Sequence, residues 1–182
     1  MKNLFIFLQK CVGGMNCVFC QILNARILKL SLPSISYAFW TFKLSKGSMT
    51  VIGHRAIFAS NSEIVANGQI SIGKKFCINK FSRVVAKEKI TIGDNVTIAQ
   101  FVAILDHDHA YHFENGNMIF RGYKTSPIVI GNNVWIADKV TICKGVSIGS
   151  NVIIGANSVV ISDIQDNCIA AGNPAKLIRE MH

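Results

Sequence analysis

The sequence has little charge and few prolines, and these shortages already limit what it can be. Only 16% of the 182 residues are charged and 3 are proline, whereas 50% are hydrophobic and 14 are glycine. This balance excludes a disordered or low-complexity chain. A chain of this length predicts about one domain. Abundant Ile and Val, together with glycine and little proline, favour strands and turns over helices.

Acidic residues are absent from the first third of the chain, where none precedes Glu63. The basic residues of that stretch supply most of the formal net charge of +9: Lys2, Lys10, Arg26, Lys29, Lys43, Lys46 and Arg55. The stretch has no zinc-finger spacing and no RNA-recognition signature, so we expect no nucleic-acid partner. Basic residues followed by aromatic ones suit peripheral contact with an anionic membrane surface. An ordinary helix packed on the first part of the domain is the alternative.

Long apolar runs and paired cysteine motifs are also missing. Leu4–Leu8 is too short for the core of a signal peptide, and no run of about 18 uncharged apolar residues follows. Cys17 and Cys20 form a C-x-x-C without a second pair at metal spacing, so the six cysteines are expected to be reduced. These features predict a cytoplasmic protein, with contact at the inner face of the membrane left open.

The strongest positive signal is an internal repeat of six residues. The repeated aliphatic positions are Ile130, Ile136, Ile142, Ile148, Ile154 and Val160. Six residues fit one short strand and one tight corner, and three such edges close a triangular coil of 18 residues. Asn133, Gly145, Asn151 and Asn157 are expected at corners, because these residue types tolerate positive φ. Stacked coils bury a continuous aliphatic column, so the repeat predicts an all-β parallel β-helix.

The repeat is interrupted between Ile104 and Ile130, an interval that is not a multiple of six. We predict that Asp106–Pro127 leaves the prism as a long loop, which is typical of functional excursions. The loop contains His107, His109 and His112. With Asp106 and Asp108 these histidines have the composition of a zinc site. Alternatively, a neutral imidazole accepts the proton of a substrate hydroxyl.

The segments Ile-Gly-Asn-Asn-Val-Trp and Ile-Gly-Ser-Asn-Val-Ile resemble the repeats of the hexapeptide-repeat acyltransferases. The resemblance covers roughly Ile52–Glu180, and Ile92–Trp135 is similar to galactoside and maltose acetyltransferases and to enzymes that acetylate capsule or lipopolysaccharide sugars. It implies a left-handed parallel β-helix and transfer of acetyl from acetyl-CoA to a sugar hydroxyl, in surface polysaccharide biosynthesis. It also implies a homotrimer, with acetyl-CoA between neighbouring prisms.

Matched residue by residue, the resemblance assigns roles within this sequence. His109 falls on the catalytic base, with His107 as the next candidate beside the substrate. Asn79 falls on an acceptor-binding asparagine, whereas Lys87 replaces an acidic acceptor-binding residue of the galactoside enzymes, which argues against a galactoside acceptor. The positions that contact coenzyme A are Trp135, Asp138, Ala156, Lys176 and Arg179. No metal is expected in this interpretation.

Two other activities remain open on the same fold. One is a zinc-dependent enzyme like the γ-carbonic anhydrases, and the other is an N-acetyltransferase acting on an amino sugar nucleotide. For the domain organisation, we predict a basic, apolar and helical segment at 1–46 and the left-handed β-helix acetyltransferase domain at 47–174. A C-terminal capping helix is expected at 175–182, because Pro174 suits the first position of a helix.

Overall fold

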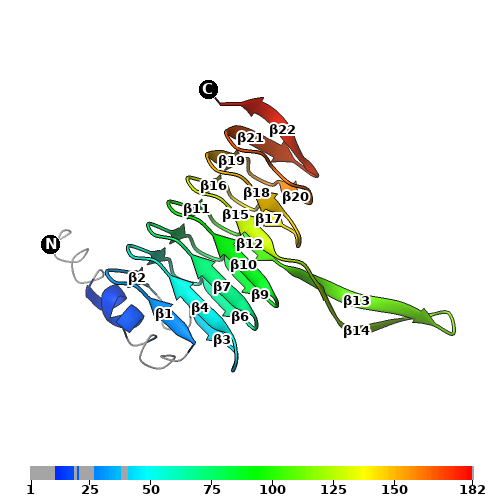
Figure 1. Ribbon diagram of the computed structural model, residues 1–182, viewed down its shortest axis with the longest axis horizontal. Coiled ribbons are helices and arrows are strands. Elements are labelled where there is room, and N and C mark those ends of the chain that lie inside the picture. Colours follow the sequence, from blue (N-terminus) through cyan, green and yellow to red (C-terminus); the bar gives the residue numbers. More distant parts are fainter. Residues whose placement is uncertain (1–10, 19, 21–26, 38–40, 182) are drawn as a thin grey trace.

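The computed structural model describes residues 11–18, 20, 27–37 and 41–181, and most of them form a parallel β-solenoid of about seven turns (Figure 1). The chain passes through sheets A, B and C in succession and then begins the next coil. The predicted all-β parallel solenoid is therefore confirmed. In the part of the chain that the structure describes, no helix is both long and apolar enough to cross a membrane.

Each side of the solenoid is one parallel sheet. Sheet A contains β1 (Leu28–Leu30), β4 (Met49–Ile52), β7 (Gln69–Ile72), β10 (Lys89–Ile92), β15 (Ile128–Ile130) and β18 (Ser147–Ile148). Sheet B contains β2 (Ile35–Ser36), β5 (Ile57–Phe58), β8 (Cys77–Ile78), β11 (Thr97–Ile98), β16 (Trp135–Ile136), β19 (Val152–Ile154), β21 (Cys168–Gly172) and β22 (Ala175–Glu180). Sheet C contains β3 (Phe42–Leu44), β6 (Glu63–Ala66), β9 (Arg83–Ala86), β12 (Ala103–Leu105), β17 (Thr141–Ile142) and β20 (Val159–Val160).

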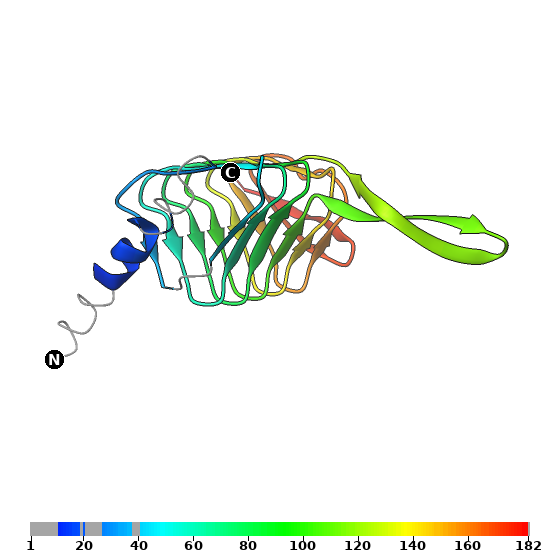
Figure 2. The ribbon, with the colours of Figure 1, turned by 90° about the horizontal axis from the view of Figure 1, so that it is seen from below.

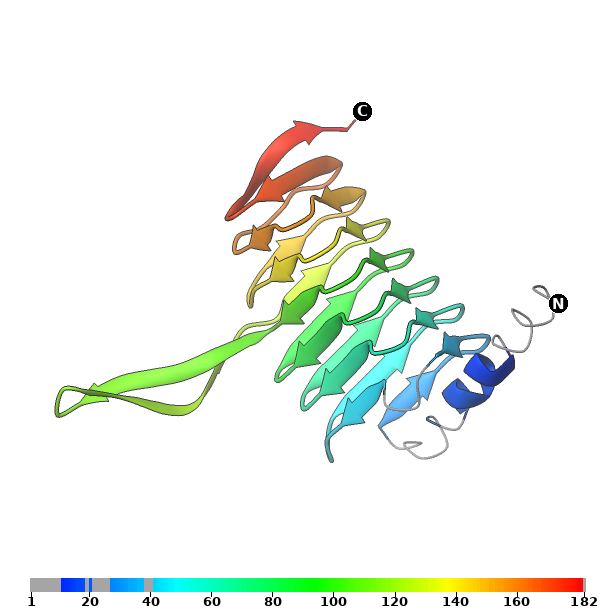
Figure 3. The ribbon, with the colours of Figure 1, turned by 180° about the vertical axis from the view of Figure 1, so that it is seen from behind.

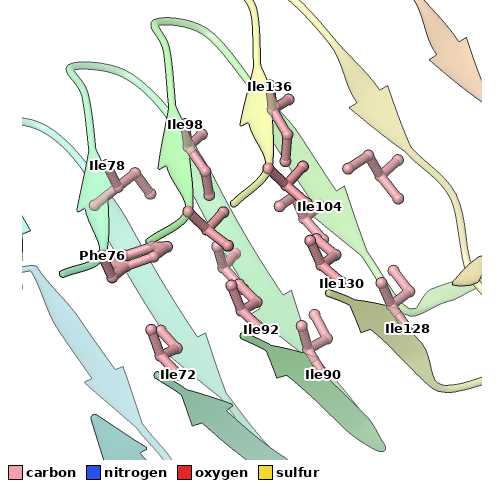
Figure 4. Packing of buried hydrophobic residues seen from close by; sticks show 14 of the residues in the cluster. Ile72, Phe76, Ile78, Ile90, Ile92, Ile98, Ile104, Ile128, Ile130 and Ile136 are labelled. Carbon is pink, nitrogen blue, oxygen red and sulfur yellow. The ribbon is translucent and has the colours of Figure 1, made fainter. Parts of the chain in front are cut away.

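The core is a column of aliphatic side chains inside the three sheets. Figure 4 shows equivalent residues of successive coils stacked on one another, including Ile72, Ile92 and Ile130 from sheet A and Ile78, Ile98 and Ile136 from sheet B. Ser158 occupies an inward position of the repeat and is fully buried, whereas Trp135 points outward and is 52% exposed. Alternation along each strand, with one side chain inward and the next outward, explains this division.

The coils differ in length, and the difference is confined to one corner. Ile136 pairs with Ile154, eighteen positions along the chain, as the repeat predicts. Ile72 pairs with Ile92, twenty positions along. The two additional residues lengthen the path between β9 and β10, where Lys87 and Glu88 form the corner between sheets C and A. This longer corner lies immediately below the excursion that follows Leu105.

The corners predicted from the repeat are confirmed by their backbone conformation. Asn133, Gly145, Asn151 and Asn157 all have positive φ. At the corner between sheets A and B the asparagines of successive coils are also joined through their side chains. The Nδ2 of Asn133 donates to the Oδ1 of Asn151 at 3.0 Å, and the Nδ2 of Asn151 donates to the Oδ1 of Asn167 at 2.8 Å. One residue type therefore supplies both the turn conformation and a bond between coils.

The N-terminal boundary predicted at residue 47 is wrong, because the first coil already begins at β1. Residues 11–18 form the expected helix, which lies at the open end of the solenoid (Figure 1). The first coil is hidden in the sequence because polar residues fill inward positions: Ser36 is fully buried and lies 3.0 Å, Oγ to Oγ1, from the buried Thr41. Lys2, Lys10 and Arg26, which suggested membrane contact, lie outside the described residues.

The C-terminal helix predicted at 175–182 is also wrong. Ala175–Glu180 forms the strand β22, which pairs antiparallel with β21, and Pro174 lies in the turn between them. The physical reason is that β21 is the last parallel strand and would otherwise present an unpaired edge. Backbone pairing with that edge outweighs the local helix preference of Ala-Lys-Leu-Ile-Arg-Glu.

Candidate active site

The predicted excursion leaves the solenoid at the corner between sheets C and A. It is an ordered antiparallel hairpin of β13 (His107–Glu114) and β14 (Asn117–Thr125) rather than an irregular loop. Asn115 and Gly116 make the tip, both with positive φ. The hairpin projects well away from the prism (Figures 1 and 2). Its exposed large side chains are Tyr111, Phe113, Met118, Phe120 and Tyr123.

Asp106 anchors the base of the hairpin to the longer corner of the preceding coil. Its carboxylate is fully buried and accepts hydrogen bonds from three consecutive backbone N–H groups, those of Lys87, Glu88 and Lys89, each at 2.8 Å. The Nδ1 of His107 lies 3.1 Å from the Oδ1 of Asp106. Because four polar groups already surround this carboxylate, its role is structural: it fixes the point at which the hairpin begins.

His109 lies among aromatic rings of the opposite strand. The centroid of its ring is 4.9 Å from that of Tyr123 and 6.3 Å from that of Phe120. The ring of His107 packs edge to face with that of Tyr123, at 5.3 Å between centroids. The side chain of His109 is exposed, whereas that of His107 is only 14% exposed. Of these two histidines, His109 is therefore the one whose imidazole is open to a substrate.

Asp108 forms an ion pair with Lys144, 2.6 Å from Oδ2 to Nζ. Lys144 lies at the same corner in the next coil, after β17. The hydrogen bond with Asp108 raises the pKa of Lys144 above its usual value. Burial raises the pKa of the neighbouring Cys143 thiol, and the Asp108 carboxylate raises it further while Lys144 opposes the increase. Asp106 anchors the hairpin from below, and the Asp108–Lys144 pair anchors it from above.

The two predicted acceptor residues lie at different corners of the prism. Lys87 is at the corner between sheets C and A, and its Nζ lies 4.0 Å from the ring centroid of Tyr123. Asn79 follows β8 at the corner between sheets B and C, where its Nδ2 donates to the carbonyl oxygen of Ile98 at 3.0 Å. Within one copy of the chain, Lys87 therefore contacts the same ring as His109, that of Tyr123, whereas Asn79 lies at another corner.

The predicted coenzyme A residues gather on sheet B and at its corner with sheet C. The register places Trp135 beside Ile153, then Ile169, then Arg179, in one outward row. Lys176 is on the same last strand, β22, and is exposed. Two further positions lie in turns at the edge of this sheet, namely Asp138, whose Oδ1 accepts the backbone N–H of Gln100 at 2.8 Å, and the exposed Ala156.

The hairpin and this row lie on different sides of one prism. The hairpin emerges where sheets C and A meet, and sheet B does not share that edge. Figure 3 shows the hairpin projecting outward rather than folding back over its own solenoid. A site that contains both His109 and Trp135 therefore requires two copies of the chain.

Sequence reasoning missed Tyr123 as the neighbour of His107 and His109, and Lys144 as the partner of Asp108. Lys144 is 36 positions from Asp108, and the two meet because the six-residue repeat returns the chain to the same corner. The six-residue period was therefore the sequence signal from which this ion pair could have been predicted. Among the described residues, no three His, Cys, Asp or Glu side chains are arranged so that they could hold a metal ion.

Comparison with known proteins agrees with the repeat and the fold. The profile described as bacterial transferase hexapeptide (six repeats) matches residues 127–162. The chain is 39% identical to the galactoside O-acetyltransferase of Escherichia coli K12 over 142 residues, which are 76% of this chain and 68% of the relative. It is 35% identical to the putative lipopolysaccharide biosynthesis O-acetyl transferase WbbJ of the same organism, over 62% of this chain and 61% of that protein.

A solved structure of galactoside acetyltransferase in complex with coenzyme A has a similar fold. Its TM-score is 0.55 at 32% identity, and the match covers 86% of this chain and 65% of that one. This chain therefore spans about two thirds of the length of the relatives it matches. The repeat, the solenoid and these similarities agree, and the chain belongs to the hexapeptide-repeat acetyltransferase family.

Proposed function

We propose that the protein transfers acetyl from acetyl-CoA to a hydroxyl of a sugar, within the synthesis of a surface polysaccharide. The observation that carries this proposal is the exposed imidazole of His109, held against Tyr123 on an ordered hairpin in a chain of this family. The names of the galactoside and lipopolysaccharide relatives favour a sugar acceptor, and the coenzyme A complex of the galactoside enzyme favours acetyl-CoA as donor.

His109 acts as the general base. A neutral imidazole nitrogen accepts the proton of the sugar hydroxyl while the hydroxyl oxygen attacks the thioester carbonyl. The tetrahedral intermediate then expels the thiolate of coenzyme A, which receives that proton from the imidazolium. A backbone N–H at Asp138 is the candidate donor to the oxyanion, since the Asp138 carboxylate holds Gln100 and fixes the local backbone. No covalent acetyl-enzyme is needed, because both substrates are held together.

Acetyl-CoA binds along the outer face of sheet B. Trp135 and Ile153 provide an apolar surface for the pantetheine arm, and Ala156 leaves space at the corner. Lys176 and Arg179 are exposed cations on β22 and bind the nucleotide phosphates. Because His109 lies on another side of the same prism, the hairpin of one copy supplies the base to the sheet of its neighbour. This requirement supports an oligomer, and the homotrimer that the family resemblance implies meets it.

The experiment is acetyl-CoA turnover by the full chain with free sugars and nucleotide sugars as acceptors. His109→Ala is expected to lower the rate by about 10²–10⁴. The matched control is His112→Ala, since His112 is an exposed histidine of the same strand whose nearest charged partner is Glu114 at 3.7 Å, Nε2 to Oε2. Near-normal turnover by His109→Ala would remove this mechanism. Loss of turnover in chelator, restored by zinc, would favour the metal-dependent alternative.

A further inference from the structure

Lys87 places a positive charge close to the proposed base. Its Nζ lies 4.0 Å from the ring centroid of Tyr123, and the same ring lies 4.9 Å from that of His109. The ammonium group and the imidazole therefore contact one common aromatic ring. A group that reaches the hydroxyl site beside His109 also lies within the field of this cation.

The two carboxylates at the base of the hairpin already have partners. Asp106 is buried and bonded to three backbone N–H groups and to His107. Asp108 is paired with Lys144. No ion pair of Lys87 occurs among the residues that the structure describes. The charge of Lys87 is thus left without a protein anion, although its side chain is half-buried.

The position of Lys87 is built into the fold. The two additional residues in the coil create the corner on which it lies, and the buried Asp106 fixes its backbone N–H at 2.8 Å. The face of Tyr123 holds the end of the side chain. Lys89, two residues further, bonds the same carboxylate through its backbone, but its side chain is exposed at the start of β10. Lys89 is therefore a matched control for Lys87, because its backbone has the same anchor and its side chain is exposed.

We propose that Lys87 selects an acceptor that carries an anionic group, a carboxylate or a phosphate, close to the hydroxyl that is acetylated. This inference depends on the proposed function and specifies its substrate class. The cation of this half-buried side chain is compensated best by a charged acceptor, because an anionic group adds the Coulomb attraction between opposite charges to the hydrogen bond. A neutral sugar leaves this cation uncompensated.

The test compares acceptors that share one sugar ring and differ at C6, where one member of each pair carries an anionic group, in the presence of saturating acetyl-CoA. Galacturonic acid against galactose tests a carboxylate, and glucose 6-phosphate against glucose tests a phosphate. We expect kcat/KM to be about 10- to 100-fold higher for at least one charged acceptor than for its neutral counterpart. Lys87→Gln should abolish the preference and leave the KM for acetyl-CoA unchanged, while Lys89→Gln should retain the preference.

Three results would overturn the inference: equal use of charged and neutral acceptors, an unchanged preference in Lys87→Gln, or a raised KM for acetyl-CoA in that variant. Dissociation of the oligomer in Lys87→Gln, seen by light scattering, would assign the cation to a carboxylate of a neighbouring copy instead. Saturation-transfer NMR on His109→Ala separates this inference from the proposed function. One informative result is that the charged acceptor binds to His109→Ala, that this binding is lost when Lys87→Gln is added, and that the unaltered protein shows no turnover. This result would contradict the transferase activity and retain the anion site.

Discussion

The carboxylate of Asp106 accepts the backbone N–H of Lys87 at 2.8 Å, although the two residues belong to different coils. The same carboxylate starts the hairpin and stabilises the corner below it. The point at which the hairpin that carries His109 leaves the solenoid and the backbone position of Lys87 are therefore fixed by one buried group. The consequences can be tested at Asp106 itself and at the neighbouring contacts.

Replacement of Asp106 by Asn should lower the free energy of unfolding by about 2–4 kcal/mol, because hydrogen bonds to a charged acceptor are lost and backbone donors remain without partners. Urea denaturation followed by circular dichroism measures the change. Asp108→Asn is the control, since its ion pair with Lys144 is partly exposed and should contribute under about 1 kcal/mol. Equal losses in the two variants would contradict a structural role specific to Asp106.

Activity should be restored by mixing two inactive variants if His109 and Trp135 of different copies share one site. His109→Ala lacks the proposed base, and Trp135→Ala lacks the apolar side chain proposed to contact acetyl-CoA. After dissociation and reassembly in equal amounts, about a quarter of the sites should contain both native residues. Turnover of the mixture is compared with that of each variant treated alone. A mixture no more active than its components would place both residues in one copy.

Asp108 should influence the pH at which the Cys143 thiol becomes reactive, because its carboxylate raises the pKa of that thiol. Burial first, and then the Asp108 carboxylate, raise the pKa of this thiol, so less of the reactive thiolate is present at a given pH than in a free cysteine peptide. In Asp108→Asn the pH at which alkylation accelerates should fall, and in Lys144→Gln it should rise. Peptide mass spectrometry after timed iodoacetamide labelling measures both shifts. If the pH of alkylation shifted in the same direction in both variants, the opposite effects of Asp108 and Lys144 on the thiol would be contradicted.

Substitutions in the hydrogen-bonded row of Asn133, Asn151 and Asn167 should show how much the positive φ of the corner affects the free energy of unfolding. Asn151 has a φ of 56° and bonds to asparagines of both neighbouring coils. Asn151→Ala should destabilise the protein by about 1–2 kcal/mol, since alanine loses both side-chain bonds and is strained at positive φ. Asn151→Gly loses the bonds but not the conformation and should cost less. Thermal unfolding of the two variants measures the difference. Equal losses of stability would show that only the side-chain hydrogen bonds contribute.

Much of the fold could be predicted because the six-residue period is a local property. The period identifies inward residues such as Ile136, outward residues such as Trp135 and corner residues such as Asn133, and all three lie as expected. The ends could not be predicted in this way. Ser36 occupies an inward position with a polar side chain and conceals the first coil, and β22 forms only because β21 presents an edge to pair with.

The sequence by itself determined the parallel solenoid, because a repeated pattern of aliphatic residues and turn residues can bury its apolar surface in that way. It also located the excursion with His109. Only the tertiary structure decided which groups surround His109. Tyr123 comes from the opposite hairpin strand and contacts both His109 and Lys87, whereas Lys144 comes from the next coil and pairs with Asp108. The separation of His109 from sheet B is likewise a property of the closed prism, because a side chain on one corner cannot reach a face that does not share it.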